Sequence, residues 1–187
     1  MHVMKSTRWI SALAVGALAL GAVAVAAASG SGAERRAKPK VECLGITATI
    51  IGKRGTDKFL VGTDKSDVIA GRGGDDTIRS RGGDDIVCAN GDSAQVGAGA
   101  GDDVVGLFGD SSFALLGSGD DLGFGSPGVN IFSGGSGDDD IQASDGNDIL
   151  LGGSGDDRLD GGLDTDQCDG GGDVDEANGC EAVSNVP

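Results

Sequence analysis

The stretch from Gly134 to Asp160 reads GGSGDDDIQ-ASDGNDILL-GGSGDDRLD, three consecutive segments of nine residues. Its first and third segments follow one template: Gly, Gly, any residue, Gly, any residue, Asp, any residue, an aliphatic residue and any residue. Self-similarity at a fixed short period is the signature of a solenoid, in which each repeat stacks on its neighbours. This repeat therefore determines the architecture that we expect for the chain.

The nine-residue register runs without insertion or deletion from Lys53 to Asp169, which makes thirteen units. The eighth position is apolar in eleven of them, and the exceptions are Gly123 and Cys168. The eighth-place residues are Leu60, Ile69, Ile78, Val87, Val96, Val105, Ala114, Gly123, Phe132, Ile141, Leu150, Leu159 and Cys168. Each unit predicts a glycine-rich loop, in which φ can be positive, followed by a short strand with its aliphatic residue inward. One unit cannot bury that side chain alone, so stacking is obligatory.

Residues 53–175 resemble the repeats-in-toxin, or haemolysin-type, calcium-binding nonapeptide repeats. The resemblance implies an all-β fold, a right-handed parallel β-roll in which two nonapeptides make one turn. It also implies that several Ca²⁺ ions lie between loops of adjacent turns, held by backbone carbonyls and by the sixth-place aspartates. A calcium ion takes six to eight oxygen ligands at about 2.3–2.6 Å, which such loops could supply.

With two units per turn, alternate loops lie on opposite edges of the roll. On the first edge the sixth-place residues are Asp67, Asp85, Asp103, Asp121, Asp139 and Asp157, with Asp175 beyond the last clear unit. On the second edge they are Asp76, Ala94, Ser112, Asn130, Asp148 and Asp166. We therefore expect four or five calcium sites in a continuous row on the first edge. The second edge should be mostly empty between Asp76 and Asp148, with one site between Asp148 and Asp166.

The candidate ligands include the sixth-place aspartates and the loop glycines that would offer carbonyl oxygens. They are Asp67, Asp76, Gly83, Asp85, Gly101, Asp103, Gly119, Asp121, Gly137, Asp139, Asp148, Gly155, Asp157 and Asp166. Lys58 and Lys65 fall in the first two loops, where a positive charge would compete with an ion. The site at Asp67 should therefore be the weakest of its row.

The charge balance points to divalent cations as partners. The chain has 30 Asp and Glu against 14 Lys and Arg, and from Gly82 onward 23 acidic residues face a single basic one, Arg158. Such a segment repels itself into disorder unless a cation neutralises it, and it excludes nucleic acid as a partner. The alternatives are solvated Asp-Gly turns without metal, or a disordered low-complexity chain.

The amino terminus has the layout of a secretory signal peptide over residues 1–28. Lys5 and Arg8 precede an uncharged apolar run, 9–28, whose last residues Ala26–Ala28 resemble a cleavage site. We therefore expect a secreted, extracellular protein. The alternative is a retained membrane helix, because twenty apolar residues can span a bilayer.

The remaining chain divides into three segments. Residues 29–42 are rich in Gly, Ser and basic residues and predict a flexible linker. Residues 43–169 should form the β-roll, beginning with a strand over 43–52 that caps its open end. Residues 170–187 should form a C-terminal cap closed by a disulfide.

The four cysteines allow three pairings in an exported chain. We favour Cys168–Cys180, which closes a short acidic loop, and Cys43–Cys88, which ties the entry segment to the early repeats. Free or intermolecular thiols are the alternative.

Enzymatic activity is not expected. The only histidine, His2, lies in the predicted signal peptide, and no nucleophile or phosphate-binding motif occurs. We expect a monomer. The alternative function is a calcium-stiffened structural or adhesive module that contacts a cell-surface or wall polymer. Four phenylalanines near the ligand-poor stretch could either replace ions by apolar packing or present a partner surface: Phe108, Phe113, Phe124 and Phe132.

Overall fold

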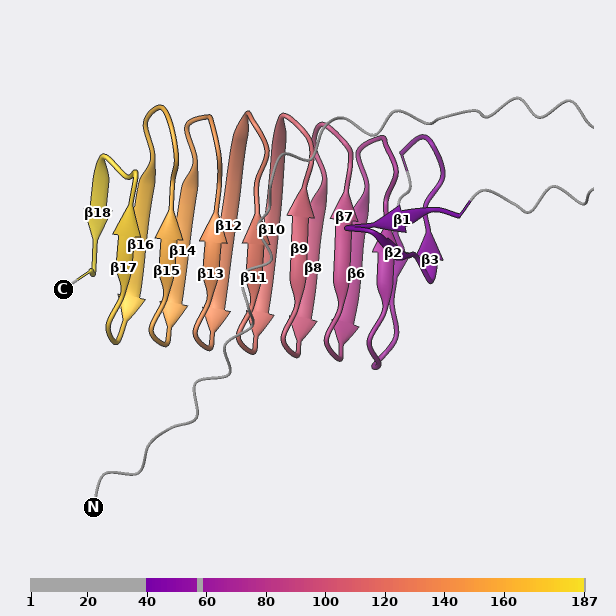
Figure 1. The fold of residues 1–187 in the computed structure, drawn as a ribbon, viewed down its shortest axis with the longest axis horizontal. Helices are drawn as coiled ribbons and strands as arrows, with labels where there is room; N and C mark the ends of the chain where they lie inside the picture. The colour runs from indigo at the N-terminus through magenta and orange to yellow at the C-terminus, as the bar shows by residue number, and fades with distance from the viewer. Residues whose placement is uncertain (1–39, 57–58, 187) are drawn as a thin grey trace, which may run out of the picture. The chain divides into compact units, whose positions relative to one another are not determined.

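The computed structural model describes residues 40–56 and 59–186, within one compact unit that spans Lys38–Pro187. The predicted signal peptide and most of the predicted linker lie outside the described residues. The described part of the chain is all-β and contains no helix long and apolar enough to cross a membrane. Its strands are stacked side by side from the entry strands to the C-terminal end (Figure 1).

Two eight-stranded sheets make up the fold. In what we call the even sheet, the order along the stack is β4 (Leu60–Val61), β6 (Thr77–Gly82), β8 (Gln95–Ala100), β10 (Ser111–Ser118), β12 (Val129–Ser136), β14 (Ile149–Ser154), β16 (Gln167–Gly172) and β18 (Ala182–Ser184). In the odd sheet it is β3 (Ile50–Ile51), β5 (Val68–Ala70), β7 (Ile86–Ala89), β9 (Val104–Leu107), β11 (Leu122–Phe124), β13 (Asp140–Gln142), β15 (Arg158–Asp160) and β17 (Glu176–Asn178).

All pairs within the two sheets are parallel, and most have the register that the repeat predicts. Ile69 pairs with Val87 in the odd sheet and Ile78 pairs with Val96 in the even sheet, an offset of eighteen residues in each case. Two nonapeptides therefore make one turn of a parallel β-solenoid, which confirms the predicted fold class.

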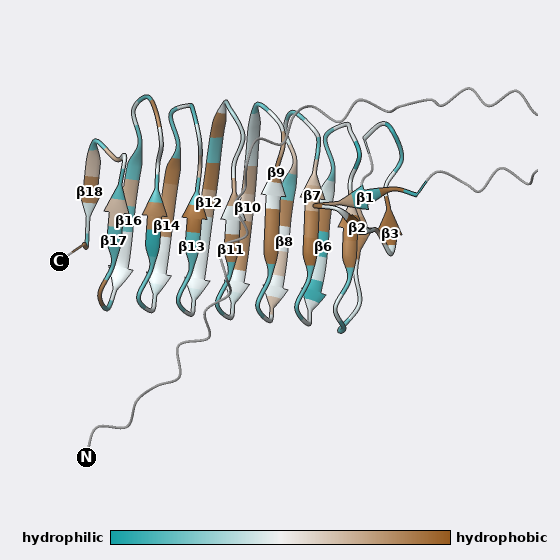
Figure 2. Ribbon diagram, viewed as in Figure 1, coloured by the Kyte–Doolittle hydropathy of each residue, from teal (hydrophilic) through white to brown (hydrophobic). Residues whose placement is uncertain are grey.

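The core lies between the two sheets and is built from the eighth-place residues. Every one from Ile69 to Cys168 is buried, while Leu60 at the entry is half-buried. Gly123 is the glycine of this series, and a Cβ there would lie 3.0 Å from a ring carbon of Phe132. The missing side chain thus makes room for the largest residue of the core. Apolar residues are concentrated in the strands and polar residues in the loops (Figure 2).

Several core residues occupy a position that the template reserves for glycine. First-place residues in the central turns point into the core and are at most 1% exposed: Ala89, Ala98, Leu107, Leu116 and Ala143. The core is therefore thicker at its centre than the eighth-place residues alone predict.

The loops depend on positive φ at the second and fourth places of the repeat. Gly135 and Gly137 have φ of 120° and 122°, in the region where a Cβ would be strained. Arg81 occupies a second place with a φ of 85°, although it is not a glycine. Its backbone therefore carries the cost of a left-handed conformation, about 1–2 kcal/mol.

Arg81→Gly is expected to raise the stability of the calcium-bound fold by about 0.5–1 kcal/mol, because the relief of strain exceeds the added entropy of the unfolded chain. Thermal unfolding at saturating calcium measures the effect, which corresponds to roughly 1–4 °C. The matched control is Arg79→Gly, which removes a strand side chain stacked on Phe59, with 5.5 Å between the guanidinium carbon and the ring centroid. This control should lower the melting temperature, and an equal rise in both variants would contradict the strain at Arg81.

The entry segment differs from the single strand expected over 43–52. It forms an antiparallel hairpin of β1 (Glu42–Cys43) and β2 (Ile46–Thr47), followed by β3 in the odd sheet. Leu44 and Gly45 have φ of 49° and 83°, and two consecutive positive values suit a two-residue hairpin turn. The alternation of polar and apolar residues that predicted one strand is also the pattern of a hairpin.

Both disulfides agree with the predicted pairing. Cys43 of the hairpin is bonded to Cys88 of β7, with 5.6 Å between the Cα atoms. The two cysteines are buried with Ala48 and Ala70, so the hairpin packs against the early turns. Cys168 is bonded to Cys180, with 6.0 Å between the Cα atoms.

The sheets extend beyond residue 169, where we expected the roll to end. β17 continues the odd sheet with an offset of eighteen residues, and β18 continues the even sheet as far as Ser184. The segment predicted as a separate cap thus contributes the last strands of both sheets. The nine-residue count continues through this unit, with Asp175 at the sixth place and Ala177 at the eighth, although Asp173 stands where the template has glycine.

Candidate metal centres

The sixth-place aspartates of the first edge lie in one unbroken row, one per turn. Each is at most 9% exposed. The backbone N–H of each donates to Oδ1 of the aspartate in the next turn, as from Asp121 to Asp139 and from Asp139 to Asp157, both at 2.9 Å. The same bond links Asp67, Asp85, Asp103 and Asp121 at the entry side and Asp157 to Asp175 at the other. One oxygen of each carboxylate is thereby fixed by the backbone.

The second oxygen of each carboxylate after Asp67 has no such partner. Oδ2 is buried without a hydrogen bond, within the described part of the chain, at Asp85, Asp103, Asp121, Asp139, Asp157 and Asp175. A buried charged oxygen without a donor costs several kcal/mol unless a cation compensates it. The row therefore has oxygen atoms that could bind a cation and lacks protein groups that would neutralise their charge.

At Asp139, Asp157 and Asp175 this oxygen converges with a carbonyl of the following turn. A Cβ placed on Gly152 would meet Asp157 Oδ2 and would lie 2.6 Å from the carbonyl oxygen of Gly170. Two acceptors thus face the same space between turns, with only hydrogen atoms of glycine beside them. Carboxylate and carbonyl oxygens in a flexible arrangement are the ligands that Ca²⁺ takes. The residues therefore fit calcium.

The fourth-place glycines allow adjacent loops to approach closely. Gly83, Gly101, Gly119, Gly137 and Gly155 all have positive φ. A Cβ on Gly101 would lie 2.7 Å from the carbonyl oxygen of Gly83 in the preceding turn. Any side chain at these places would force the turns apart and separate the ligand oxygens.

Burial raises the pKa of the row aspartates above the ordinary value. The pKa of Asp103 and that of Asp139 rise to about 7, and the pKa of Asp121 and that of Asp157 rise to about 6. Desolvation is the main cause, neighbouring carboxylates add to it, and the backbone N–H bonds oppose it. Ionised aspartates in this row are therefore unfavourable without a counter-charge.

The site at Asp67 differs from the others in its hydrogen bonds. Its Oδ2 accepts from the backbone N–H of Thr63 at 2.7 Å and from the hydroxyl of Thr63 at 2.8 Å. The oxygen that faces a cation elsewhere is therefore engaged here. Lys65 is exposed, and Lys58 lies outside the described residues. The structure thus gives a second reason for the prediction that this is the weakest site of the row.

An outer row of aspartates runs beside the first, and the sequence analysis did not identify it. Its fifth-place members are exposed: Asp84, Asp102, Asp120, Asp138 and Asp156. Oδ1 of each accepts from the backbone N–H one turn later, as from Asp156 to Asp138 at 2.9 Å. The recurring Asp-Asp pair in each loop was the signal. These carboxylates hold the turns together by hydrogen bonds and add negative charge beside the inner row.

The sixth places of the second edge are acidic at both ends and carry no carboxylate in the middle. Asp148 Oδ1 accepts from the N–H of Asn130 at 2.7 Å, and Asp166 Oδ1 accepts from the N–H of Asp148 at 2.8 Å. Oδ2 is buried without a hydrogen bond among the described residues at both aspartates. The structure therefore brings Asp148 and Asp166 together. Asp76 is buried, and the sixth-place residue of the next turn is Ala94, which has no carboxylate.

Asn130 occupies a sixth place of the second edge and has an amide where the template has a carboxylate. Its amide Nδ2 donates to the carbonyl of Ser126 at 2.6 Å and to that of Gly128 at 3.2 Å. In the turn before, Ser112 Oγ accepts from the N–H of Ala94 at 3.3 Å. Ser112 Oγ also donates to the carbonyl of Gly91 at 3.3 Å, so neutral donors bind loop oxygens in this stretch. That this part of the second edge holds no ion stays a prediction.

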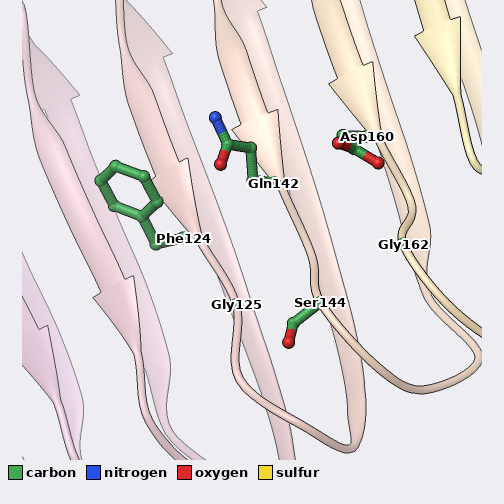
Figure 3. Close-up of a pocket in the computed structure, with 6 residues that line it drawn as sticks. All are labelled: Phe124, Gly125, Gln142, Ser144, Asp160 and Gly162. Carbon is green, nitrogen blue, oxygen red and sulfur yellow. The ribbon is translucent and has the colours of Figure 1, made fainter. Parts of the chain in front are cut away.

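A shallow groove lies away from the sixth-place aspartates. It has a volume of about 300 Å³ and is lined by Phe124, Gly125, Gln142, Ser144, Asp160 and Gly162 (Figure 3). Phe124, Gln142 and Asp160 are ninth-place residues of successive turns, on the outer face of the odd sheet. Phe132, by contrast, is fully buried in the core. A partner surface formed by the other phenylalanines stays a prediction.

The arrangement of ligands explains why no compact cluster of metal-binding side chains is present. The described residues contain no group of three or more His, Cys, Asp or Glu side chains that could hold a metal ion. Each interval between turns supplies one or two carboxylates, so backbone carbonyls must supply the other protein ligands. A parallel β-solenoid with such oxygen-lined intervals belongs to the class of calcium-binding β-rolls.

Comparison with known families identifies the chain more closely. The model of the RTX calcium-binding nonapeptide repeat, which has four copies of the repeat, matches residues 61–94, 116–150 and 142–177. These segments cover just over half of the chain, and the chain belongs to this family. The unmatched interval 95–115 contains the divergent loop that ends at Ser112. No curated protein and no solved structure matches the chain.

Proposed function

We propose that this chain is a secreted, non-catalytic calcium-binding β-roll that folds as it binds several Ca²⁺ ions between adjacent turns. The observation that carries the proposal is the row of buried Oδ2 atoms on the first edge from Asp85 onward, each without a hydrogen bond among the described residues. At Asp139, Asp157 and Asp175 a carbonyl oxygen of the next turn lies beside this oxygen. The acidic residues recur in every turn, which suits a ladder of ligands better than a unique acid–base pair. The N-terminal apolar run and the two disulfides support an extracellular location.

The mechanism is metal-coupled folding. Without calcium, stacking the turns buries carboxylates against one another, and a core of small aliphatic residues does not offset the entropy of the chain. When calcium is bound, the carboxylate of one turn and the carbonyl of the next would hold the ion, which would supply the positive charge that the buried row lacks. The free energy of binding then contributes directly to folding.

The expected affinity matches the proposed location. Extracellular calcium modules bind at about 10⁻⁴–10⁻³ M, so the chain would remain unfolded in a calcium-poor cell and fold after export. Magnesium should not replace calcium, because Mg²⁺ requires short, near-octahedral coordination and retains its waters. The long row of shared protein oxygens does not suit that geometry.

Titration of the mature chain with calcium at pH 7.5 tests the proposal. Far-UV circular dichroism should change from coil to β-sheet with a midpoint of about 10⁻⁴–10⁻³ M calcium, while magnesium at the same concentrations leaves the spectrum unchanged. A β-sheet spectrum in chelator that calcium does not alter would refute the metal-coupled mechanism. A spectrum that stays coil up to tens of millimolar calcium would do the same.

A further inference from the structure

The last turn of the second edge is shorter than the others. Leu150 of β14 pairs with Cys168 of β16 at the usual offset of eighteen residues, whereas Cys168 pairs with Val183 of β18 at an offset of fifteen. The nine-residue count gives Ser184 as the next sixth-place residue, and by that count the row of carboxylates on the second edge ends at Asp166.

Glu181 takes the place of the missing aspartate. The backbone N–H of Asp166 donates to Glu181 Oε2 at 2.7 Å. One turn earlier, the N–H of Asp148 makes the equivalent bond with Asp166 Oδ1 at 2.8 Å. The longer side chain of glutamate thus reaches the end of the row from a turn that has lost three residues.

The space beside Asp166 has the same acceptors as the first-edge intervals. Asp166 is fully buried, and its Oδ2 has no hydrogen bond among the described residues. A Cβ on Gly161 would lie 2.6 Å from Asp166 Oδ2 and 2.6 Å from the carbonyl oxygen of Gly179. A carboxylate oxygen and a carbonyl oxygen of the next turn therefore converge here, as they do beside Gly152. Burial, followed by like charges that include Glu181, raises the pKa of Asp166.

The Cys168–Cys180 disulfide positions both contributors from the last turn. Cys180 lies between Gly179 and Glu181 in the chain, and its partner Cys168 lies two residues after Asp166. The bond thus closes a short loop across the site. Without it, the shortened turn would depend on the hydrogen bonds of β18, an edge strand whose three residues are all exposed.

We propose that Asp166, Glu181 and the carbonyl of Gly179 form a further calcium site at the C-terminal end of the second edge, held together by the Cys168–Cys180 disulfide. The inference rests on the proposed calcium-dependent function and adds a site that the repeat pattern does not contain. Calcium bound here fastens β18 to the roll, so occupancy of the site and order of the last strand depend on the oxidised state of the two cysteines.

Calcium binding to the full mature chain tests the site, by isothermal titration calorimetry together with hydrogen–deuterium exchange. Glu181→Gln should bind one ion fewer than the wild type, and its β18 amides should lose their calcium-dependent protection. The amide oxygen of glutamine can still accept from the N–H of Asp166, so the turn should still fold. The control is Glu176→Gln, which changes an exposed glutamate whose carboxylate accepts from Asn178 at 3.2 Å. This control should bind as many ions as the wild type.

The double variant Cys168→Ser/Cys180→Ser tests the role of the disulfide. Calcium affinity at the first-edge sites should match that of the wild type, while the terminal site should lose at least tenfold in affinity. Adding Glu181→Gln to this variant should cause no further loss of calcium binding. Equal stoichiometry and β18 protection in the wild type and Glu181→Gln would overturn the terminal site. An unchanged affinity in the cysteine variant would overturn the role of the disulfide. Absence of calcium binding in every variant would instead refute the proposed function itself.

Discussion

Asp139→Asn should weaken the calcium-bound roll and strengthen the metal-free one. Asp139 lies in the middle of the first-edge row, where its Oδ2 is buried without a donor. Asparagine keeps the shape of the side chain but removes the charge that holds an ion. At 10 mM calcium, a site with a dissociation constant of about 10⁻⁴–10⁻³ M stabilises the fold by roughly 1.4–2.7 kcal/mol, and the variant should lose about this amount per site.

In chelator, Asp139→Asn should raise the stability of the fold, because it removes a charge that the other carboxylates of the row repel. Burial and the neighbouring carboxylates of Asp121 and Asp157 raise the pKa of Asp139 to about 7. At pH 8 the metal-free fold therefore carries an unfavourable charge, which the neutral amide removes. Asn130 shows that an amide is accepted at a sixth place, since it donates to carbonyls of the second and fourth residues of its loop.

Two titrations measure these effects. Urea unfolding at 10 mM calcium gives the stability of the calcium-bound fold. Folding by an osmolyte such as trimethylamine N-oxide, in chelator at pH 8, gives that of the metal-free fold. The matched control is Asp138→Asn, which changes the adjacent exposed carboxylate. Its Oδ1 accepts from the N–H of Asp156 at 2.9 Å, a bond that an amide oxygen can also accept. The control should change stability by less than about 0.5 kcal/mol in both series. Equal losses in the two variants with calcium would show that burial of the inner row has no bearing on metal binding.

The features that the nonapeptide count predicts are those that depend on a repeated environment. The parallel register, the eighth-place core and the two unlike edges all follow from one residue type recurring at a fixed place. Stacked turns give each place the same neighbours, so a row such as Asp85 to Asp157 must align once the register is known. The disulfide pairing does not follow from the count, because Cys43 precedes the repeats and Cys180 lies in the shortened last turn.

The features that the count misses arise where a local substitution changes the geometry. Leu107 and Leu116 stand where the template has glycine, and they turn into the core instead of lining a loop. Leu44 and Gly45 form a hairpin turn within the segment predicted as one strand. Glu181 enters the carboxylate row only because the last turn is three residues shorter. In each case the deciding contact comes from another turn, which a count along the chain does not contain.

Acidification should fold the metal-free chain, whereas it should weaken the effect of calcium. The folded pKa of Asp103 and that of Asp139 are raised to about 7, against an ordinary value of 3.8, so the folded state binds more protons than the unfolded state between these limits. The free energy of unfolding without metal therefore falls as pH rises from about 4 to about 7 and stays low above that range. In chelator, far-UV circular dichroism should show more β-sheet at pH 5 than at pH 8.

Calcium reverses this dependence, because an ion can bind only after the proton leaves the carboxylate. The calcium concentration at the midpoint of folding should therefore fall as pH rises from 5.5 to about 8, with the steepest change near the raised pKa values of about 6 and 7. The double variant Asp103→Asn/Asp139→Asn removes the two most strongly raised groups and should flatten both profiles. A metal-free chain that is more folded at pH 8 than at pH 5 would mean that the row is not buried as described. Protons and calcium compete for the same oxygens only if those oxygens are enclosed between the turns.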